Sequence, residues 1–101
     1  MITGVAIKDV NGKVWSLPKP NRHGHIFIDN KAKGIDNAPL RTGVQGFVND
    51  KGEFLDRQAA SIEASANKQI LPPYDPSDSS KRRWDLEPSK PPFELFSEDL
   101  W

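Results

Sequence analysis

Apolar and polar residues alternate in two short segments near the N-terminus, and this pattern predicts a β-hairpin. The segments span residues 5–8 and 13–17, and the connection between them contains Asn11-Gly12. An Asn-Gly pair readily takes the positive φ angles that a tight reversal requires. Pro18 follows, and it ends the second strand because proline has no amide proton to donate to the strand ladder.

Residues 22–33 fit a short helix, with Asn21 as a side-chain cap and Gly34 just beyond its end. Two observations oppose the helix. Residues 25–29 fit a strand equally well, and Gly24 lowers the stability of a helix by about 1 kcal/mol. The pattern therefore leaves both structures open for this segment.

A second hairpin is predicted over residues 44–48 and 53–55, which are joined by a four-residue connection rich in turn-forming residues. Asp56 follows directly and can cap a helix over residues 57–66, and Asn67 provides its stop signal. A hairpin followed by a helix is the clearest local prediction in the chain.

Six of the nine prolines lie between positions 71 and 93, so this stretch is expected to lack regular structure and to wrap a surface or stay mobile. We expect one α+β domain, with a small antiparallel β-sheet built from two hairpins, one or two short helices and a Pro-rich irregular segment. Residues 1–70 form its core, residues 71–93 a Pro-rich loop, and residues 94–101 a C-terminal segment of the same domain that docks on the core.

Composition narrows the class of protein. The chain has 101 residues, 14 basic and 14 acidic, so no overall positive field attracts it to long nucleic acids or to a membrane surface. Only 36% of the residues are hydrophobic, which predicts a thin core and favours self-association. The chain has no cysteine, no long apolar run and no signal-peptide pattern, so we expect a cytoplasmic protein.

Arg22-His23-Gly24-His25 is similar to the Arg-His-Gly signature of histidine phosphatases. That family needs a larger α/β domain and a distant second histidine, and this chain has no histidine outside positions 23 and 25. His23 and His25 could supply two metal ligands, but no third ligand stands at a characteristic spacing from them. We therefore predict neither a catalytic nor a metal site. Arg22 and His23 are candidates for contacting phosphate; otherwise one histidine caps or packs locally and the other is solvated.

Arg57 begins the predicted helix, where a guanidinium group can bind two phosphate oxygens and the helix dipole favours an anion. The alternative is a solvated arginine beside a capping Asp56. Phe47 lies in a predicted strand and can stack on a base, although phenylalanines that alternate along strands, as Phe47 and Phe54 do, more often belong to a core.

The run Lys81-Arg82-Arg83-Trp84 places three cations beside an indole, and Arg82 and Arg83 are candidate phosphate ligands. Such runs are also typical of solvated loops and partner-binding patches. Glu98 and Asp99 can accept hydrogen bonds from ribose hydroxyls, or they form the acidic first turn of a terminal helix capped by Ser97.

Taken in order, these segments resemble a family of small phage proteins, the Thoeris anti-defence sponges. The most specific parts are Gly46-Phe47, residues 52–57 and residues 97–101. The resemblance implies a phage protein in the cytoplasm of an infected bacterium that sequesters a cyclic ADP-ribose isomer or a cyclic oligonucleotide. It also implies no cofactor, no cleavage of the ligand and a homo-oligomer with ligand pockets near subunit boundaries.

The chain departs from the family pattern in two places. Glu53 stands where a basic residue is expected, four positions before Arg57, and the Pro-rich stretch is unusually long. That stretch contains Tyr74, Arg82, Arg83 and Trp84, which are residue types favoured at interfaces, so an inhibitor that binds a host defence enzyme through residues 71–93 is the alternative hypothesis. An enzyme that uses His23 as acid or base has the least support, because nothing marks a partner for that histidine.

Overall fold

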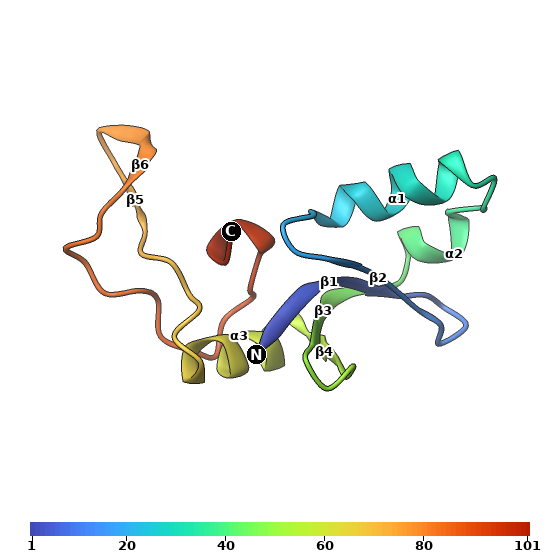
Figure 1. Ribbon diagram of the computed structural model, residues 1–101, viewed down its shortest axis with the longest axis horizontal. Coiled ribbons are helices and arrows are strands. Elements are labelled where there is room, and N and C mark those ends of the chain that lie inside the picture. Colours follow the sequence, from blue (N-terminus) through green and yellow to red (C-terminus); the bar gives the residue numbers. More distant parts are fainter.

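The computed structural model describes residues 1–101 and confirms the predicted α+β fold. Four antiparallel strands form one sheet in the order β2-β1-β3-β4 (Figure 1). Their bounds are β1 Ile2–Lys8, β2 Val14–Pro18, β3 Val44–Asn49 and β4 Phe54–Asp56. The first hairpin supplies β1 and β2, the second supplies β3 and β4, and β1 pairs with β3 along nearly its whole length.

Three short helices accompany the sheet: α1 (His23–Ala32), α2 (Ala38–Arg41) and α3 (Arg57–Ala66). The helix predicted over residues 22–33 is confirmed as His23–Ala32, which excludes a strand at residues 25–29, and Gly34 follows it with φ of 72°. The predicted cap is wrong, because the Asn21 side chain donates to the Pro18 carbonyl and does not cap the helix. The helix predicted over residues 57–66 is also confirmed, and the Asp56 side chain accepts a hydrogen bond of 2.8 Å from the Ala59 amide. None of the helices is both long and apolar enough to cross a membrane.

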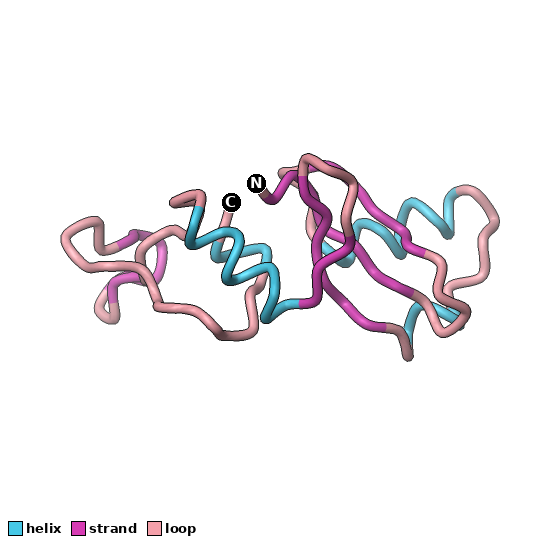
Figure 2. The backbone as a smooth tube through the Cα atoms, turned by 90° about the horizontal axis from the view of Figure 1, so that it is seen from below, coloured by secondary structure: helices cyan, strands magenta, loops and turns pink.

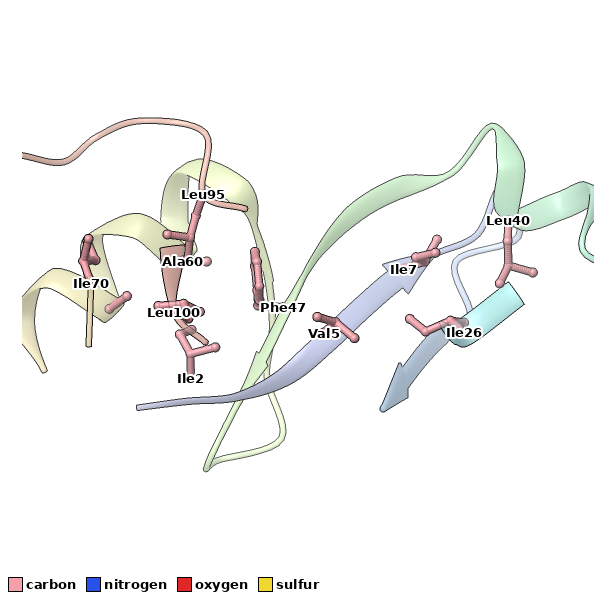
Figure 3. Packing of buried hydrophobic residues seen from close by; sticks show 11 residues of the cluster. Ile2, Val5, Ile7, Ile26, Leu40, Phe47, Ala60, Ile70, Leu95 and Leu100 are labelled. Carbon is pink, nitrogen blue, oxygen red and sulfur yellow. The ribbon is translucent and has the colours of Figure 1, made fainter. Parts of the chain in front are cut away.

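One cluster of buried side chains holds the sheet, the helices and the C-terminal segment together. Phe47 lies between two groups of this cluster (Figure 3). One group comes from the middle of the sheet and from the first two helices, and the other from α3 and the two ends of the chain. The first contains Val5, Ile7, Ile26 and Leu40, and the second contains Ile2, Ala60, Ile70, Leu95 and Leu100. Ala64 of α3 belongs to the same cluster.

The Pro-rich stretch corrects one prediction, because part of it forms regular structure. Strands β5 (Tyr74–Asp75) and β6 (Asp78–Arg82) pair as a small antiparallel hairpin. Asp75 accepts hydrogen bonds from the backbone and hydroxyl of Ser77, and Asp78 does the same from Ser80, so short polar side chains stabilise the turn despite the prolines. The hairpin lies at the opposite end of the molecule from α1 and α2 (Figures 1 and 2).

Candidate functional site

An open cleft of about 510 Å³ lies where β3 and the start of α3 meet the C-terminal segment. We call it the Arg57 cleft. Polar groups dominate its wall, which is formed by Gly43, Val44, Gln45, Asp56, Arg57, Gln58 and Glu94. The cleft exists because β4 ends at Asp56 and the chain turns directly into α3, whereas β3 continues past that point toward Gly43.

Arg57 is the one cation in the wall of this cleft. Its Nη2 donates a hydrogen bond to Oε1 of Gln45, and its guanidinium carbon lies 4.5 Å from the ring centroid of Phe96. The Nε atom is buried and has no hydrogen-bond partner. A buried guanidinium N–H without an acceptor is costly, so Nε leaves Arg57 with unused hydrogen-bonding capacity beside the cleft.

His23 lies in the first turn of α1, against Gly46 and Phe47 of β3. Its Nε2 donates a hydrogen bond of 2.7 Å to the Gly46 carbonyl, and its ring meets Phe47 edge-to-face at 5.2 Å. Burial lowers the pKa of His23, and the charge of Arg57 lowers it further, against the raising effects of the Gly46 carbonyl and of Glu98. His23 is therefore neutral at pH 7.

Arg22 directly precedes α1, and its backbone N–H donates to Nδ1 of His25 at 2.9 Å. His25 is thus the histidine that caps locally, whereas His23 is buried. The Nη1 atom of Arg22 is buried without a hydrogen-bond partner, as Nε of Arg57 is. Both α1 and α3 begin beside Gly46, which accepts from His23 and pairs with Asp56 in the sheet register.

The two acidic candidates differ in what they contact. Asp99 lies in the terminal 3-10 turn η1 (Ser97–Asp99), and its Oδ2 accepts a hydrogen bond of 2.8 Å from the Phe96 amide. The prediction that Ser97 caps the terminal helix is therefore wrong. The side chain that accepts a hydrogen bond from the backbone at the start of this turn belongs to Asp99, and the donor is the Phe96 amide. Glu98 is exposed, and its charge raises the pKa of His23, so its carboxylate remains accessible near the predicted site.

The basic run of residues 81–83 is not available as a group of unpaired cations. Arg82 donates to the Pro72 carbonyl at 2.8 Å, to the Tyr74 hydroxyl at 3.1 Å and to the Glu98 carbonyl. Arg83 forms an ion pair of 2.8 Å with Asp85. The predicted role of Arg82 and Arg83 as phosphate ligands therefore has no support from this arrangement.

Phe47 requires a further correction, because its ring has 0% exposure and offers no face to a base. The exposed aromatic beside Arg57 is instead Phe96, which is 45% exposed. Sequence reasoning missed Phe96, because Leu95 and Phe96 are adjacent apolar residues and only the structure shows that Leu95 is buried and Phe96 is exposed. It also missed Gln45, Gln58 and Glu94, which no motif marks.

Glu53 does not oppose Arg57 as its position in sequence suggested. Its carboxylate accepts a hydrogen bond of 3.0 Å from the Asn49 side chain, and the Asn49 carbonyl oxygen Oδ1 in turn accepts from the Glu53 amide at 2.9 Å. These bonds hold Glu53 in the turn of the second hairpin, and Glu53 is not part of the cleft wall. Its carboxylate therefore does not repel an anion bound at Arg57.

Comparison with known proteins gives one match. The model of the family described as "Phage T4 y16D protein" matches residues 1–101. No curated protein and no solved structure matches the chain. The structure contains no group of three or more histidine, cysteine, aspartate or glutamate side chains that could hold a metal ion.

Proposed function

We propose that this chain, which belongs to the phage T4 y16D protein family, is an anti-defence protein that binds and sequesters a cyclic nucleotide-type immune signal. The observation that carries the proposal is the Arg57 cleft, where a buried guanidinium N–H lacks an acceptor next to an exposed aromatic ring. A cyclic ADP-ribose isomer or a cyclic oligonucleotide provides both an anionic phosphate and a flat base. The resemblance of residues 46–47, 52–57 and 97–101 to the Thoeris anti-defence sponges supports the same ligand class.

In this proposal each part of the ligand meets a different group in the wall of the cleft or beside it. A phosphate accepts from the guanidinium of Arg57, while Arg22 adds positive charge and the neutral ring of His23 adds hydrogen-bonding character from the start of α1. The base stacks on Phe96 in place of the buried Phe47. Ribose hydroxyls donate to nearby carboxylates, of which Glu94 lines the cleft and Glu98 lies near His23.

Binding without cleavage is the second part of the proposal. A general base needs an acceptor atom, on a histidine or a carboxylate, within reach of the proton that it removes. The Nε2 atom of His23 is hydrogen-bonded to the Gly46 carbonyl, and its ring is packed against Phe47. Of the two carboxylates in the cleft wall, Asp56 caps α3 through the Ala59 amide and Glu94 is assigned to ribose hydroxyls, and the proposed mechanism is slow release of an unchanged ligand.

The proposal is tested by depletion and recovery. Purified protein is mixed with cyclic ADP-ribose isomers or cyclic dinucleotides, unbound ligand is removed, and the protein is heated to release what it holds. We expect one ligand to be depleted from solution and recovered intact. The Arg57→Ala variant should fail to deplete it, whereas Arg41→Ala, which removes an exposed arginine of α2, should behave like the wild type. A chemically altered product or no depletion at all would reject sequestration.

A further inference from the structure

The wall of the Arg57 cleft carries more negative than positive charge. Arg57 is its one cation, whereas Asp56 and Glu94 supply two exposed carboxylates. Neither carboxylate lies within 4.0 Å of the guanidinium nitrogens of Arg57, so these charges do not neutralise one another in ion pairs. A ligand that enters the cleft therefore meets one positive and two negative groups.

Asp56 is held beside Arg57 by its role at the start of α3. Its Oδ1 accepts a hydrogen bond of 2.8 Å from the Ala59 amide, and Arg57 is the next residue in the chain. The carboxylate cannot turn away from a ligand without giving up this helix cap. Asp56 is thus a fixed negative charge in the cleft wall.

Glu94 is positioned by the C-terminal segment. The next residue, Leu95, is fully buried, and its amide donates a hydrogen bond of 3.2 Å to the Arg57 carbonyl. These two contacts keep Glu94 beside the cleft, where its own carboxylate forms no ion pair within the protein. The carboxylate is therefore available to accept hydrogen bonds from a ligand, and it repels excess negative charge.

Gln45 adds neutral hydrogen-bond donors to the same wall. Its Oε1 accepts from Nη2 of Arg57, and because a guanidinium group only donates, this bond fixes which end of the amide is the oxygen. The NH₂ end of Gln45 is left for an acceptor on a ligand. Together, Arg57 and Gln45 offer a single positive charge and several N–H donors, which suits an anion of single charge.

We propose that the Arg57 cleft accepts a phosphodiester, which carries one negative charge, and rejects a phosphomonoester, which carries nearly two at neutral pH. This inference rests on the proposed function and names the class of phosphate that the site takes. Asp56 and Glu94 are the specificity-determining residues, because they repel the second charge of a monoester and accept hydrogen bonds from hydroxyls beside a diester. A cyclic nucleotide opened at a phosphodiester bond gains a terminal monoester, so the cleft retains the intact ring and releases the opened product.

The probes are adenosine monophosphate and cyclic adenosine monophosphate, which share adenine and ribose and differ in the charge of the phosphate. Amide chemical shifts of the full chain during titration to about 10 mM give both dissociation constants. At about pH 8 we expect the cyclic probe to bind at least about fivefold more tightly. At about pH 5 the monoester carries a single charge, so the ratio of the two constants should fall below about twofold. Protonation of His23 affects both probes alike and cancels in this ratio.

A double variant tests whether the two carboxylates cause the selectivity. Asp56→Asn with Glu94→Gln removes both charges and keeps an oxygen acceptor at each position, and asparagine preserves the helix cap. Its ratio at about pH 8 should fall below about twofold. The matched control is Asp36→Asn, because Asp36 is also exposed and accepts from a backbone amide, that of Ala38 at 3.0 Å, but is not part of the cleft wall. This control should keep the wild-type ratio.

Two results overturn the selectivity. One is an affinity for the monophosphate at about pH 8 that equals or exceeds that for the cyclic probe, and the other is an unchanged ratio in a double variant that circular dichroism shows to be folded. Absence of any shift at the cleft with both probes overturns it as well. The depletion experiment with cyclic ADP-ribose isomers and cyclic dinucleotides decides the proposed function separately, so a protein that sequesters its ligand without this preference is recognised as such.

Discussion

The guanidinium group of Arg57 stacks on the ring of Phe96, with 4.5 Å between the guanidinium carbon and the ring centroid. The two residues lie 39 positions apart, and they meet because Leu95 and Leu100 anchor the C-terminal segment in the core and turn Phe96 outward. This contact holds the guanidinium group at the edge of the cleft. One face of the guanidinium plane packs on the Phe96 ring, and the opposite face points away from that ring. A cation oriented in this way loses less side-chain freedom when it binds an anion.

Phe96→Ala should weaken ligand binding by about 5-fold to 150-fold, since stacking of a base on an aromatic ring contributes roughly 1 to 3 kcal/mol. It should change the free energy of unfolding by less than about 1 kcal/mol, because the ring is half exposed. Calorimetric titration gives the affinity and urea denaturation gives the stability.

Phe47→Ala is the matched comparison and should show the opposite profile. Its ring is fully buried against His23 and Trp101, so we expect a loss of about 3 to 5 kcal/mol of stability. If Phe47→Ala were stable and deficient only in binding, the assignment of Phe47 to the core and of Phe96 to the ligand would be wrong.

The affinity for an anionic ligand should rise as the pH falls from about 8 to about 5.5. Burial and Arg57 lower the pKa of His23 in the unliganded protein, and a bound phosphate offsets the charge of Arg57 and raises that pKa again. Binding therefore takes up a proton. Titration calorimetry in buffers of different ionisation enthalpy measures that uptake, which His23→Gln should abolish and His25→Gln should leave unchanged.

The free energy of unfolding of the unliganded protein should fall as the pH falls, whereas the affinity for the ligand should rise. His23 has a lower pKa when folded than in the unfolded chain, so below about pH 6.5 the unfolded chain binds more protons and the folded state loses stability. The free energy of unfolding measured in urea at several pH values checks this. A His23→Gln variant whose stability falls as steeply as the wild type over this range would show that another group is responsible.

Asp9 should add a separate loss of stability in stronger acid. Its carboxylate accepts from the Trp15 indole at 3.0 Å and from the Asn11 and Lys13 amides, and these bonds lower its pKa, the indole contact most. The stability that Asp9 provides is present above its unfolded pKa of about 3.9 and is lost as the pH falls through the lower folded value. Asp9→Asn should flatten the acid limb of the curve of stability against pH.

Gly46→Ala should destabilise the protein by about 2 kcal/mol or more, because the added methyl would lie 2.1 Å from the Leu55 carbonyl oxygen and 2.8 Å from the Phe54 ring. Gly24→Ala is the control: nothing lies within 4 Å of its added carbon, and alanine favours the helix, so the free energy of unfolding should rise by up to about 1 kcal/mol. Thermal and urea denaturation of both variants measure these changes. Equal effects would contradict close packing at Gly46.

Local signals in the sequence were sufficient for both main hairpins and for the helix over residues 57–66, whereas they left helix and strand open for residues 22–33. Asn11-Gly12 and the residues after Asn49 specify turns by their own backbone preferences, and Asp56 caps its helix through a contact three residues away. Helix α2 was not predicted because it has only four residues, one of them a proline, and so few residues cannot show the hydrophobic period of a helix. The β5–β6 hairpin was missed because the prolines outweighed the serine and aspartate pairs that form its turn.

The candidate site was predicted only in part, since its members depend on tertiary packing. Arg22, His23 and Arg57 begin two helices, and the sequence could identify them as phosphate-binding types but could not show that both helices start beside Gly46. Alternation along β3 could not decide which of its side chains face the core. Arg82 was predicted to bind phosphate because the sequence does not reveal its actual partners. In the structure it donates hydrogen bonds to the backbone carbonyls of Pro72 and Glu98.

The central claim is that the Arg57 cleft binds a nucleotide-type anion, and amide chemical shifts during titration with a cyclic ADP-ribose isomer test it most directly. The account predicts saturable shifts concentrated at residues 43–45 and at Arg57 and Gln58, an unchanged ligand spectrum, and loss of the response in Arg57→Ala but not in Arg41→Ala. Shifts confined to other parts of the molecule, or a response that survives in Arg57→Ala, would contradict it.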